Sequence, residues 1–249
     1  MGAGSNYING NAGNDAITVG VDVAGPVAAS TGANRVLGGQ GVDTITVHGA
    51  GGNSVNGNLG NDVIDATTAT GNNSLRGGQG DDKITSGHGH DALLGDLGND
   101  TLVVSGTASD GHLTVLTGGA GSDTFDFHTV GAGTAIDLSS AGVASAATFG
   151  SKTYYQEVTD FTVGTDSIDL ANAGSSTNFA VLKSSFANVL EAYNAATNDF
   201  NAAGGTHTID AAQVGGDTYL FFRDAVGGPT EVVKLDGVTA ANLDYHSIV

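Results

Sequence analysis

Residues 77–103 have the sequence GGQGDDKIT, SGHGHDALL, GDLGNDTLV, three nonamers in direct succession. Each has Gly at its fourth position, Asp at its sixth and an apolar residue at its eighth. The same frame returns in GNAGNDAIT (10–18), GGQGVDTIT (38–46), GNLGNDVID (57–65) and GGAGSDTFD (118–126). A fixed period along half of a chain indicates a repeat architecture, in which stacked units share one core.

The period continues with Asn in place of Asp where the consensus weakens. An Asn lies nine residues before each of four Asp residues, with Gly two positions earlier and an apolar residue two positions later: Asn6, Asn34, Asn53 and Asn73. Position 8 is then apolar in all twelve nonamers, although only 39% of the chain is hydrophobic. Each nonamer is predicted to be a Gly-rich turn followed by a very short strand that points one apolar side chain inward. The sequence therefore predicts a parallel β-roll over residues 1–126, with two nonamers in each full coil.

The turns of such a roll fall on two edges, because successive nonamers turn on opposite edges and turns two nonamers apart stack. What we call the Asp edge collects Asp15, Asp43, Asp62, Asp82, Asp100 and Asp123. What we call the Asn edge collects Asn6, Asn34, Asn53, Asn73, Asp91 and Thr114. Carboxylates stacked about 5 Å apart repel one another, so the Asp edge is predicted to hold cations. The Asn edge is predicted to be either a neutral amide ladder or a row of weaker cation sites.

Two intervals along the Asp edge are clearly longer than the two nonamers of one coil. They run from Asp15 to Asp43 and from Asp100 to Asp123. Loops are therefore expected at VDVAGPVAAS (21–30) and near SGTASDGH (105–112).

The nonamer resembles the GGxGxDxUx repeats of the RTX family of calcium-binding bacterial proteins, which leave the cell by type I secretion. The resemblance implies an all-β fold with a right-handed roll that binds several Ca²⁺ ions between successive coils. In that family the ligands are position-6 carboxylates and main-chain carbonyls of the Gly-rich turns, which suit the hard-oxygen preference of Ca²⁺. The resemblance implies these ligand residues: Asp15, Asp43, Asp62, Asp82, Asp91, Asp100, Asp123, Gly38, Gln40, Gly57, Leu59, Gly77, Gln79, Asn34, Asn53 and Asn73.

Residues 127–249 are predicted to be a second region, mostly β with one helix, because the composition shifts to Ala, Ser, Thr and longer apolar runs. Residues 157–170 alternate like two paired strands around a Gly-Thr-Asp turn, and 218–224 with 230–237 predict a β-hairpin. An apolar stripe at helical spacing lies between them, formed by Phe179, Leu182, Phe186, Val189, Leu190 and Tyr193. This region is expected to cap the roll, because an open end exposes unpaired strands.

The second region resembles the cap of RTX proteases through DF (160–161), GTD (164–166) and IDL (168–170). The helical segment around 179–196 departs from the protease pattern. The last residues, 235–249, resemble an uncleaved type I secretion signal. This resemblance implies the type I secretion machinery as a partner and a location outside the cell or on its surface.

Composition excludes several classes of protein. The net charge of −19, from 7 basic and 26 acidic residues, repels nucleic acid and anionic membranes and favours cations as partners. There is no Cys for a disulfide or thiolate site. No signal peptide or membrane span is predicted, because no basic n-region precedes an apolar stretch and no run approaches 18 apolar residues. Residue 1 falls at the start of a repeat without an initiating cap, so we expect further chain upstream.

No catalytic motif is present in the sequence. The seven His residues form no H-E-x-x-H, and there is no G-x-S-x-G elbow, P-loop or thiol nucleophile. His88 and His90 flank Gly89 inside a turn and are expected to be surface residues rather than ligands of a soft metal. The chain is therefore predicted to be a non-catalytic, calcium-binding C-terminal module that folds on extracellular Ca²⁺ and mediates secretion.

Two host proteins remain open for this module. The abundance of Ala, Thr, Gly and Asp resembles bacterial S-layer proteins, in which Ca²⁺ also bridges identical subunits of a surface lattice. The alternative is the carrier tail of a secreted protease, lipase or RTX toxin or adhesin.

Overall fold

The computed structural model describes residues 4–20, 31–105, 113–127, 156–170, 174, 177–202, 206–223 and 231–249. The chain divides into two compact units, Met1–Gly106 with Thr114–Asp126 and Thr107–Leu113 with Phe127–Val249. We call them the roll and the C-terminal unit. The expected loops at 21–30 and in most of 105–112 lie outside the described residues.

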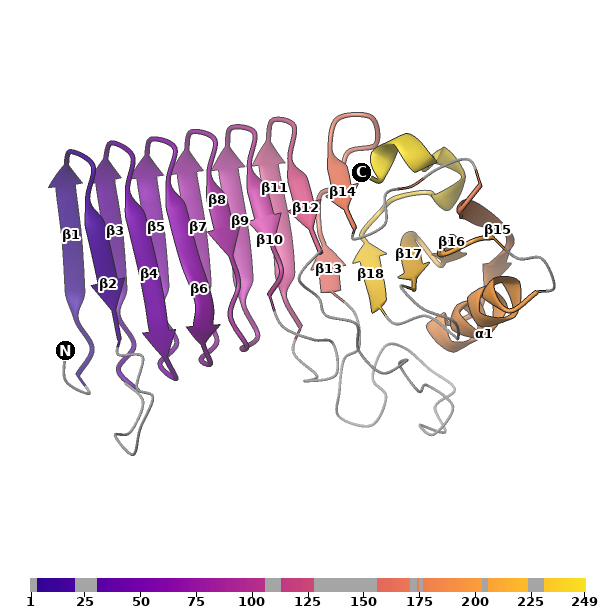
Figure 1. Cartoon of the computed structure of the whole chain (residues 1–249), viewed down its shortest axis with the longest axis horizontal. Coiled ribbons are helices and arrows are strands. Elements are labelled where there is room, and N and C mark those ends of the chain that lie inside the picture. Colours follow the sequence, from indigo (N-terminus) through magenta and orange to yellow (C-terminus); the bar gives the residue numbers. More distant parts are fainter. Residues whose placement is uncertain are drawn as a thin grey trace. The chain divides into compact units, whose positions relative to one another are not determined.

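The roll is built from short strands that alternate between two parallel sheets (Figure 1). One sheet has the order β1-β3-β5-β7-β9-β11 and the other β2-β4-β6-β8-β10-β12. Their bounds are β1 (Tyr7–Ala12), β2 (Ala16–Val19), β3 (Arg35–Gln40), β4 (Thr44–Gly49), β5 (Ser54–Leu59), β6 (Val63–Ala69), β7 (Ser74–Gln79), β8 (Lys83–Thr85), β9 (Ala92–Leu97), β10 (Thr101–Val103), β11 (Val115–Ala120) and β12 (Thr124–Asp126). Since every second strand pairs, one coil contains two nonamers, which confirms the predicted parallel β-roll.

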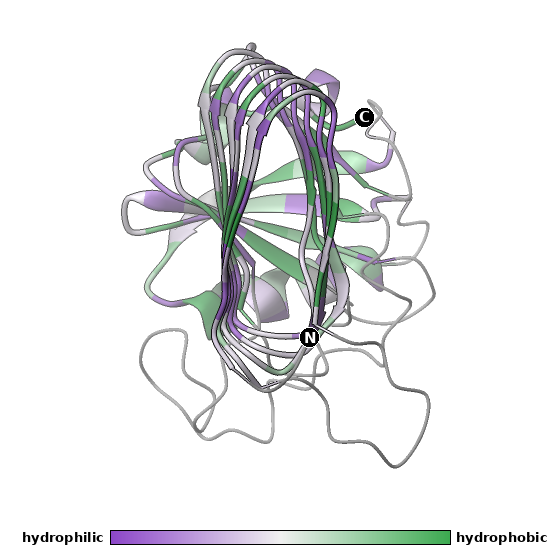
Figure 2. Cartoon of the chain, turned by 90° about the vertical axis from the view of Figure 1, so that its left-hand side faces the viewer, coloured by the Kyte–Doolittle hydropathy of each residue, from purple (hydrophilic) through white to green (hydrophobic). Residues whose placement is uncertain are grey.

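The register stacks position 8 of each nonamer on position 8 of the next coil. One column is Ile8, Val36, Val55, Leu75, Leu93 and Leu116, and the other is Ile17, Ile45, Ile64, Ile84, Leu102 and Phe125. From Val36 onward these side chains are at most 2% exposed, whereas Ile8 and Ile17 in the first described coil are half-buried. Figure 2 shows the coils superimposed in a view along the stack. The predicted inward stack of apolar side chains is confirmed.

The strands of the first sheet are longer than the sequence pattern predicts. They include positions 1 to 3 of the following nonamer, so β3 contains Gly38, Gly39 and Gln40. Main-chain pairing between coils continues through these residues, and Gly39 adopts a φ of 125° where a Cβ would collide with the main chain of Asn11. In the second sheet, a register shift between Thr46 and His48 absorbs the uneven spacing of the repeats.

Among its described residues, the C-terminal unit contains a mixed sheet with the order β13-β18-β17-β16-β15 and one α-helix. Its elements are β13 (Gln156–Val158), β14 (Ser167–Asp169), β15 (Phe179–Phe186), α1 (Val189–Phe200), β16 (Ile209–Val214), β17 (Asp217–Phe222), β18 (Glu231–Leu235) and 3₁₀ turns at Ala240–Asn242 and Tyr245–Ser247. The antiparallel pair of β17 and β18 confirms the predicted hairpin.

The expected pairing of the two strands within 157–170 is wrong. β13 pairs in parallel with β18, while β14 lies in a different sheet. The turn between them is present, with the Thr162 N–H donating to Asp166 Oδ2 at 2.8 Å. Two three-residue strands offer each other few ladder bonds, whereas β18 adds an ion pair of 2.8 Å from Lys234 to Glu157.

The helix begins later than the apolar stripe predicts. Phe179–Phe186 is strand β15, which pairs with β16, and α1 starts only after Asn188. Asn188 Oδ1 accepts the Glu191 N–H at 3.0 Å, which satisfies a donor of the first turn. A short apolar run fits a strand and a helix equally well, so here strand pairing decides. The buried face of α1 packs on Ala212, Tyr219, Phe221 and Val232.

Candidate metal centre

The Asp edge is a continuous column of side chain to main chain hydrogen bonds. The Oδ1 atom of each Asp accepts the main-chain N–H of the Asp one coil earlier. The bonds are Asp15 N to Asp43 Oδ1 (2.8 Å), Asp43 N to Asp62 (2.8 Å), Asp62 N to Asp82 (2.7 Å), Asp82 N to Asp100 (2.8 Å) and Asp100 N to Asp123 (2.9 Å). The side chains from Asp43 to Asp123 are at most 2% exposed. One oxygen of each carboxylate is thereby fixed in place.

The second oxygen of the carboxylates has no such partner. The buried Oδ2 atoms of Asp15, Asp43, Asp62, Asp82 and Asp100 lack a hydrogen bond. Leaving a charged oxygen buried and unpaired is strongly unfavourable. A column of five such atoms in one frame position therefore indicates that something other than a protein donor satisfies them.

Main-chain carbonyl oxygens lie close to these Oδ2 atoms. The point that a Cβ would occupy on Gly38 lies within 2.7 Å of both Asp43 Oδ2 and the Gly57 carbonyl oxygen. The same point on Gly57 lies within 2.7 Å of Asp62 Oδ2 and the Gly77 carbonyl oxygen. Each of these glycines thus keeps open a space where a carboxylate of one coil meets a carbonyl of the next. The donor set consists of hard oxygens, which fit Ca²⁺.

The electrostatics of the column disfavour the ionised carboxylates in the absence of a cation. Burial raises the pKa of Asp62 to about 6, of Asp82 to about 7 and of Asp100 to about 6, and the main-chain N–H bond partly offsets this. These values include a smaller contribution from the repulsion of nearby carboxylates, among them Asp43 on Asp62 and Asp123 on Asp100. A divalent cation beside Oδ2 would remove both penalties.

The Asn edge is a ladder of amides whose hydrogen-bonding groups are satisfied. Asn53 Nδ2 donates to Asn73 Oδ1 at 3.0 Å and to the Gly51 carbonyl at 2.7 Å, and the Asn53 N–H also donates to Asn73 Oδ1 at 3.0 Å. Asn6, Asn34 and Asn73 repeat this pattern. The ladder reaches Asp91, whose Oδ1 accepts from Asn73 and whose Oδ2 accepts the Gly87 N–H at 2.7 Å. The side-chain oxygens of Asn34, Asn53, Asn73 and Asp91 therefore already accept protein donors.

A sequence difference at position 1 of the turn separates the two edges. Five residues before each Asp of the Asp edge stands a glycine: Gly10, Gly38, Gly57, Gly77, Gly95 and Gly118. The corresponding residues before Asn34, Asn53, Asn73 and Asp91 are Ala29, His48, Thr68 and Ser86. A Cβ at position 1 would fill the space beside Oδ2. Glycine at this position therefore distinguishes, in the sequence, the edge whose carboxylate oxygens are left unpaired.

The carbonyl residues implied by the family resemblance fall into two groups. The carbonyls of Gly38, Gly57 and Gly77 lie beside the Asp edge carboxylates, and Gly118 lies in the same way beside Asp100 although the sequence analysis omitted it. The carbonyls of Gln40, Leu59 and Gln79 instead accept the N–H groups of Gly13, Gly41 and Gly60 at 2.8–2.9 Å. The side chains of Gln40, Leu59 and Gln79 are exposed.

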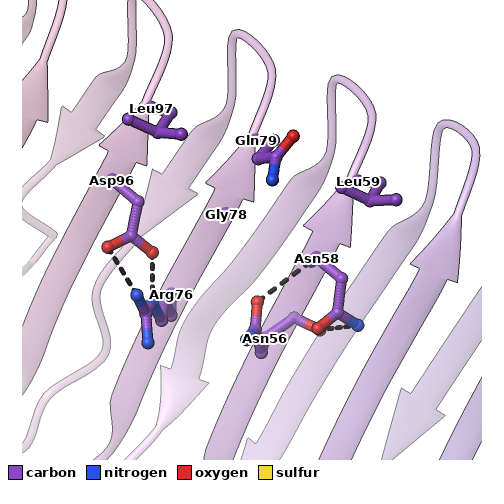
Figure 3. Close-up of a pocket in the computed structure, with 8 residues that line it drawn as sticks. All are labelled: Asn56, Asn58, Leu59, Arg76, Gly78, Gln79, Asp96 and Leu97. Atoms are coloured by element: carbon purple, nitrogen blue, oxygen red, sulfur yellow. Dashed lines mark hydrogen bonds and ion pairs between the residues drawn. The ribbon is translucent and has the colours of Figure 1, made fainter.

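A groove of about 590 Å³ lies on the outer face of β5, β7 and β9, and its charges neutralise each other (Figure 3). Arg76 pairs with Asp96 there through two hydrogen bonds. Asp96 is at position 2 of its nonamer, so it does not belong to the Asp edge. The groove has none of the unpaired carboxylate oxygens that mark that edge.

Comparison with known proteins shows four copies of the RTX calcium-binding nonapeptide repeat, at residues 2–22, 27–47, 49–67 and 67–102. Among solved structures, the chain is similar to the AlgE6R3 subunit of the mannuronan C5-epimerase from Azotobacter vinelandii, at 24% identity over 71% of this chain and 76% of that one, with a TM-score of 0.42. It is also similar to the extracellular lipase LipA from Serratia marcescens, at 15% identity over 88% of this chain and 40% of that one, with a TM-score of 0.28. Comparison with curated proteins finds no match.

Acid is expected to stabilise the metal-free roll. Because the pKa values of Asp62, Asp82 and Asp100 are raised above 3.8, their contribution to stability is complete below about pH 4 and is lost as the pH rises through 6 to 7. The strand signal of the chain in EDTA, measured by circular dichroism, should therefore be weaker at about pH 7.5 than at about pH 5. Saturating Ca²⁺ should increase this signal most at the higher pH. A metal-free roll that is at least as stable at the higher pH would contradict this account.

Proposed function

Since residues 2–102 carry the calcium-binding nonapeptide repeats of the RTX family, we propose that the chain is a non-catalytic module whose Asp edge binds a row of Ca²⁺ ions. The column of buried, unpaired Oδ2 atoms carries this proposal. The ligands would be the carboxylates of Asp15, Asp43, Asp62, Asp82, Asp100 and Asp123 with carbonyls of the position-1 glycines, including Gly38, Gly57 and Gly77. The Asn edge, whose oxygens already accept protein donors, would remain free of metal.

Calcium binding and folding are expected to be one event. The unfolded chain has no preformed site, because the ligands come from turns that meet only when the coils stack. Residues 1–126 contain 13 Asp and 3 basic residues, so the charge of the row is not balanced within the roll. Ca²⁺ ions held by these carboxylates and carbonyls would supply the missing positive charge. At cytosolic Ca²⁺ levels the roll would stay unfolded, and at about millimolar extracellular Ca²⁺ it would fold.

The C-terminal tail supports export before folding. Residues 235–249, which resemble a type I secretion signal, are packed within the C-terminal unit. Leu243 and Ile248 are at most 3% exposed, and the Val249 N–H donates to the Ile168 carbonyl at 2.9 Å. An exporter could therefore reach the side chains of Leu243 and Ile248 only in the unfolded chain. We propose that the type I machinery takes the Ca²⁺-free chain and that folding follows outside the cell.

The host protein we propose is a secreted bacterial surface protein that assembles into an S-layer lattice. The support is compositional, in the richness in Ala, Thr, Gly and Asp and the absence of Cys. A carrier tail of a secreted protease, lipase, toxin or adhesin is the alternative.

Asp82→Asn is expected to have opposite effects with and without Ca²⁺. Without Ca²⁺ it removes a buried carboxylate with a raised pKa, so in EDTA near pH 7 the variant should retain more strand signal than the wild type. With Ca²⁺ it removes a ligand, so the folding midpoint of a Ca²⁺ titration should shift to about tenfold higher concentration. Circular dichroism measures both quantities.

Asp81→Asn is the matched control, because it makes the same charge change at the neighbouring residue. Asp81 is exposed, and its Oδ1 accepts the Asn99 N–H at 2.8 Å. One coil earlier an Asn makes the same bond, because Asn61 Oδ1 accepts the Asp81 N–H at 3.0 Å. An Asn fits this position, and Asp81 adds only a minor repulsion to Asp82, so the control should shift the Ca²⁺ midpoint much less than Asp82→Asn. Equal Ca²⁺ midpoints for wild type, Asp81→Asn and Asp82→Asn would refute the Asp edge as the binding site.

Export is expected to depend on the tail. In bacteria with a type I exporter, removing residues 235–249 should reduce the protein in the medium to background, and so should a tail of the same composition in scrambled order. Immunoblots of medium and cells measure the split. Export of the shortened chain at the level of the full chain would disprove the role of the tail.

Lattice assembly predicts that the chain forms two-dimensional sheets after Ca²⁺ is added. Negative-stain electron microscopy and light scattering distinguish this from the alternative. A monodisperse, folded monomer across millimolar Ca²⁺ would instead support a carrier tail.

A further inference from the structure

The C-terminal unit contains a second group of metal-ligating side chains, unrelated to the nonamers. Asp199 lies in the last turn of α1, His207 precedes β16, and Asp210 lies within β16. We propose that these three residues form a binding site for a first-row divalent transition-metal ion such as Zn²⁺, distinct in its chemistry from the calcium row.

The three side chains converge on one point. Each offers one ligand atom, and these atoms all lie within 4.8 Å of one another. His207 Nδ1 and Asp199 Oδ2 are 2.6 Å apart, and both side chains are about one-third exposed. An ion can therefore enter from the Asp199 and His207 side, while Asp210 forms the closed floor of the site.

The burial of Asp210 is the observation that distinguishes this cluster from a chance group of surface residues. Its side chain is 0% exposed, and neither carboxylate oxygen has a hydrogen-bond partner. Burial and the charge of Asp199 raise the pKa of Asp210 to about 8, which agrees with an uncompensated buried carboxylate. A cation bound between Asp210, Asp199 and His207 would stabilise this buried carboxylate, whose two oxygens have no hydrogen bond.

Arg223, at the end of β17, is the basic group that acts on Asp210, and its charge opposes the rise in pKa. Its Nη2 donates to the carbonyls of Phe200 at 2.6 Å and His207 at 3.3 Å, and the guanidinium lies 4.8 Å from the centre of the Phe200 ring. The arginine thereby ties the end of α1 to the segment before β16. It thus fixes the main chain that carries Asp199 and His207.

The donor set determines which ion fits. An imidazole nitrogen with two carboxylates suits Zn²⁺ and its first-row neighbours, whereas Ca²⁺ prefers a larger shell of oxygens alone. Three protein ligands leave a coordination position for water.

The test is equilibrium dialysis of the full chain against Zn²⁺ in millimolar Ca²⁺, which keeps the Asp edge filled. The wild type should retain one Zn²⁺ per chain, measured by mass spectrometry of the metal. Asp210→Asn and His207→Gln should each weaken this equivalent at least about tenfold. Zn²⁺ should also raise the thermal midpoint of the wild type but not of the two variants.

His246→Gln is the matched control. His246 also pairs with a carboxylate, at 3.2 Å from Asp244 Oδ2, but both side chains are well exposed. This variant should retain the Zn²⁺ equivalent. Asp210→Asn removes a buried carboxylate without changing shape, so the metal-free variant should fold at least as well as the wild type.

Three results would overturn the proposal. They are a wild type without bound Zn²⁺, retention of full Zn²⁺ by Asp210→Asn and His207→Gln, or displacement of Zn²⁺ by millimolar Ca²⁺. The last would show a further calcium site instead. None of them bears on the Asp edge, so this test and the Asp82→Asn test fail independently.

Discussion

The roll depends on one repeated contact, in which a main-chain N–H of each coil donates to the Asp Oδ1 of the next. This bond sets the carboxylate at a fixed height between coils and directs the other oxygen toward a space kept open by glycine. The carboxylates of Asp43, Asp62, Asp82 and Asp100, which make this contact, each keep a second oxygen that is buried and unpaired. The protein therefore has no donor for these buried oxygens, and a bound cation is the partner that would neutralise them.

The two edges solve the same stacking problem in two ways. The Asn edge closes it with amides, because an amide supplies a donor where a carboxylate has only acceptors. Asn53 uses its donor on Gly51 and Asn73, and no charge remains. The Asp edge instead leaves buried carboxylate oxygens unpaired. If cations pair them, as we propose, the Asn edge is complete within the protein while the stability of the Asp edge follows the Ca²⁺ concentration.

Much of the roll could be predicted from sequence because its contacts repeat at a short, constant separation. Position 8 identified the buried columns, and position 6 identified the residues that face the next coil. The distinction between ligand and ladder was also present, in the glycine five residues before Asp62 and the Thr68 five residues before Asn73, but it required the side-chain geometry to be recognised. The sequence did not show that the carbonyls of Gln40, Leu59 and Gln79 accept main-chain N–H groups. They differ from the carbonyls of the neighbouring glycines only in the direction in which they point.

The sequence by itself determined the period, the inward stack and the acidic column, since a coil is defined within two successive nonamers. Tertiary structure decided the C-terminal unit. Phe179–Phe186 is a strand rather than a helix because it pairs with β16. The partner of β13 is β18, which is distant in the chain. Asp199, His207 and Asp210 likewise meet only because α1 ends beside the start of β16. Such contacts follow no period, so the physical reason for them lies in packing rather than in pattern.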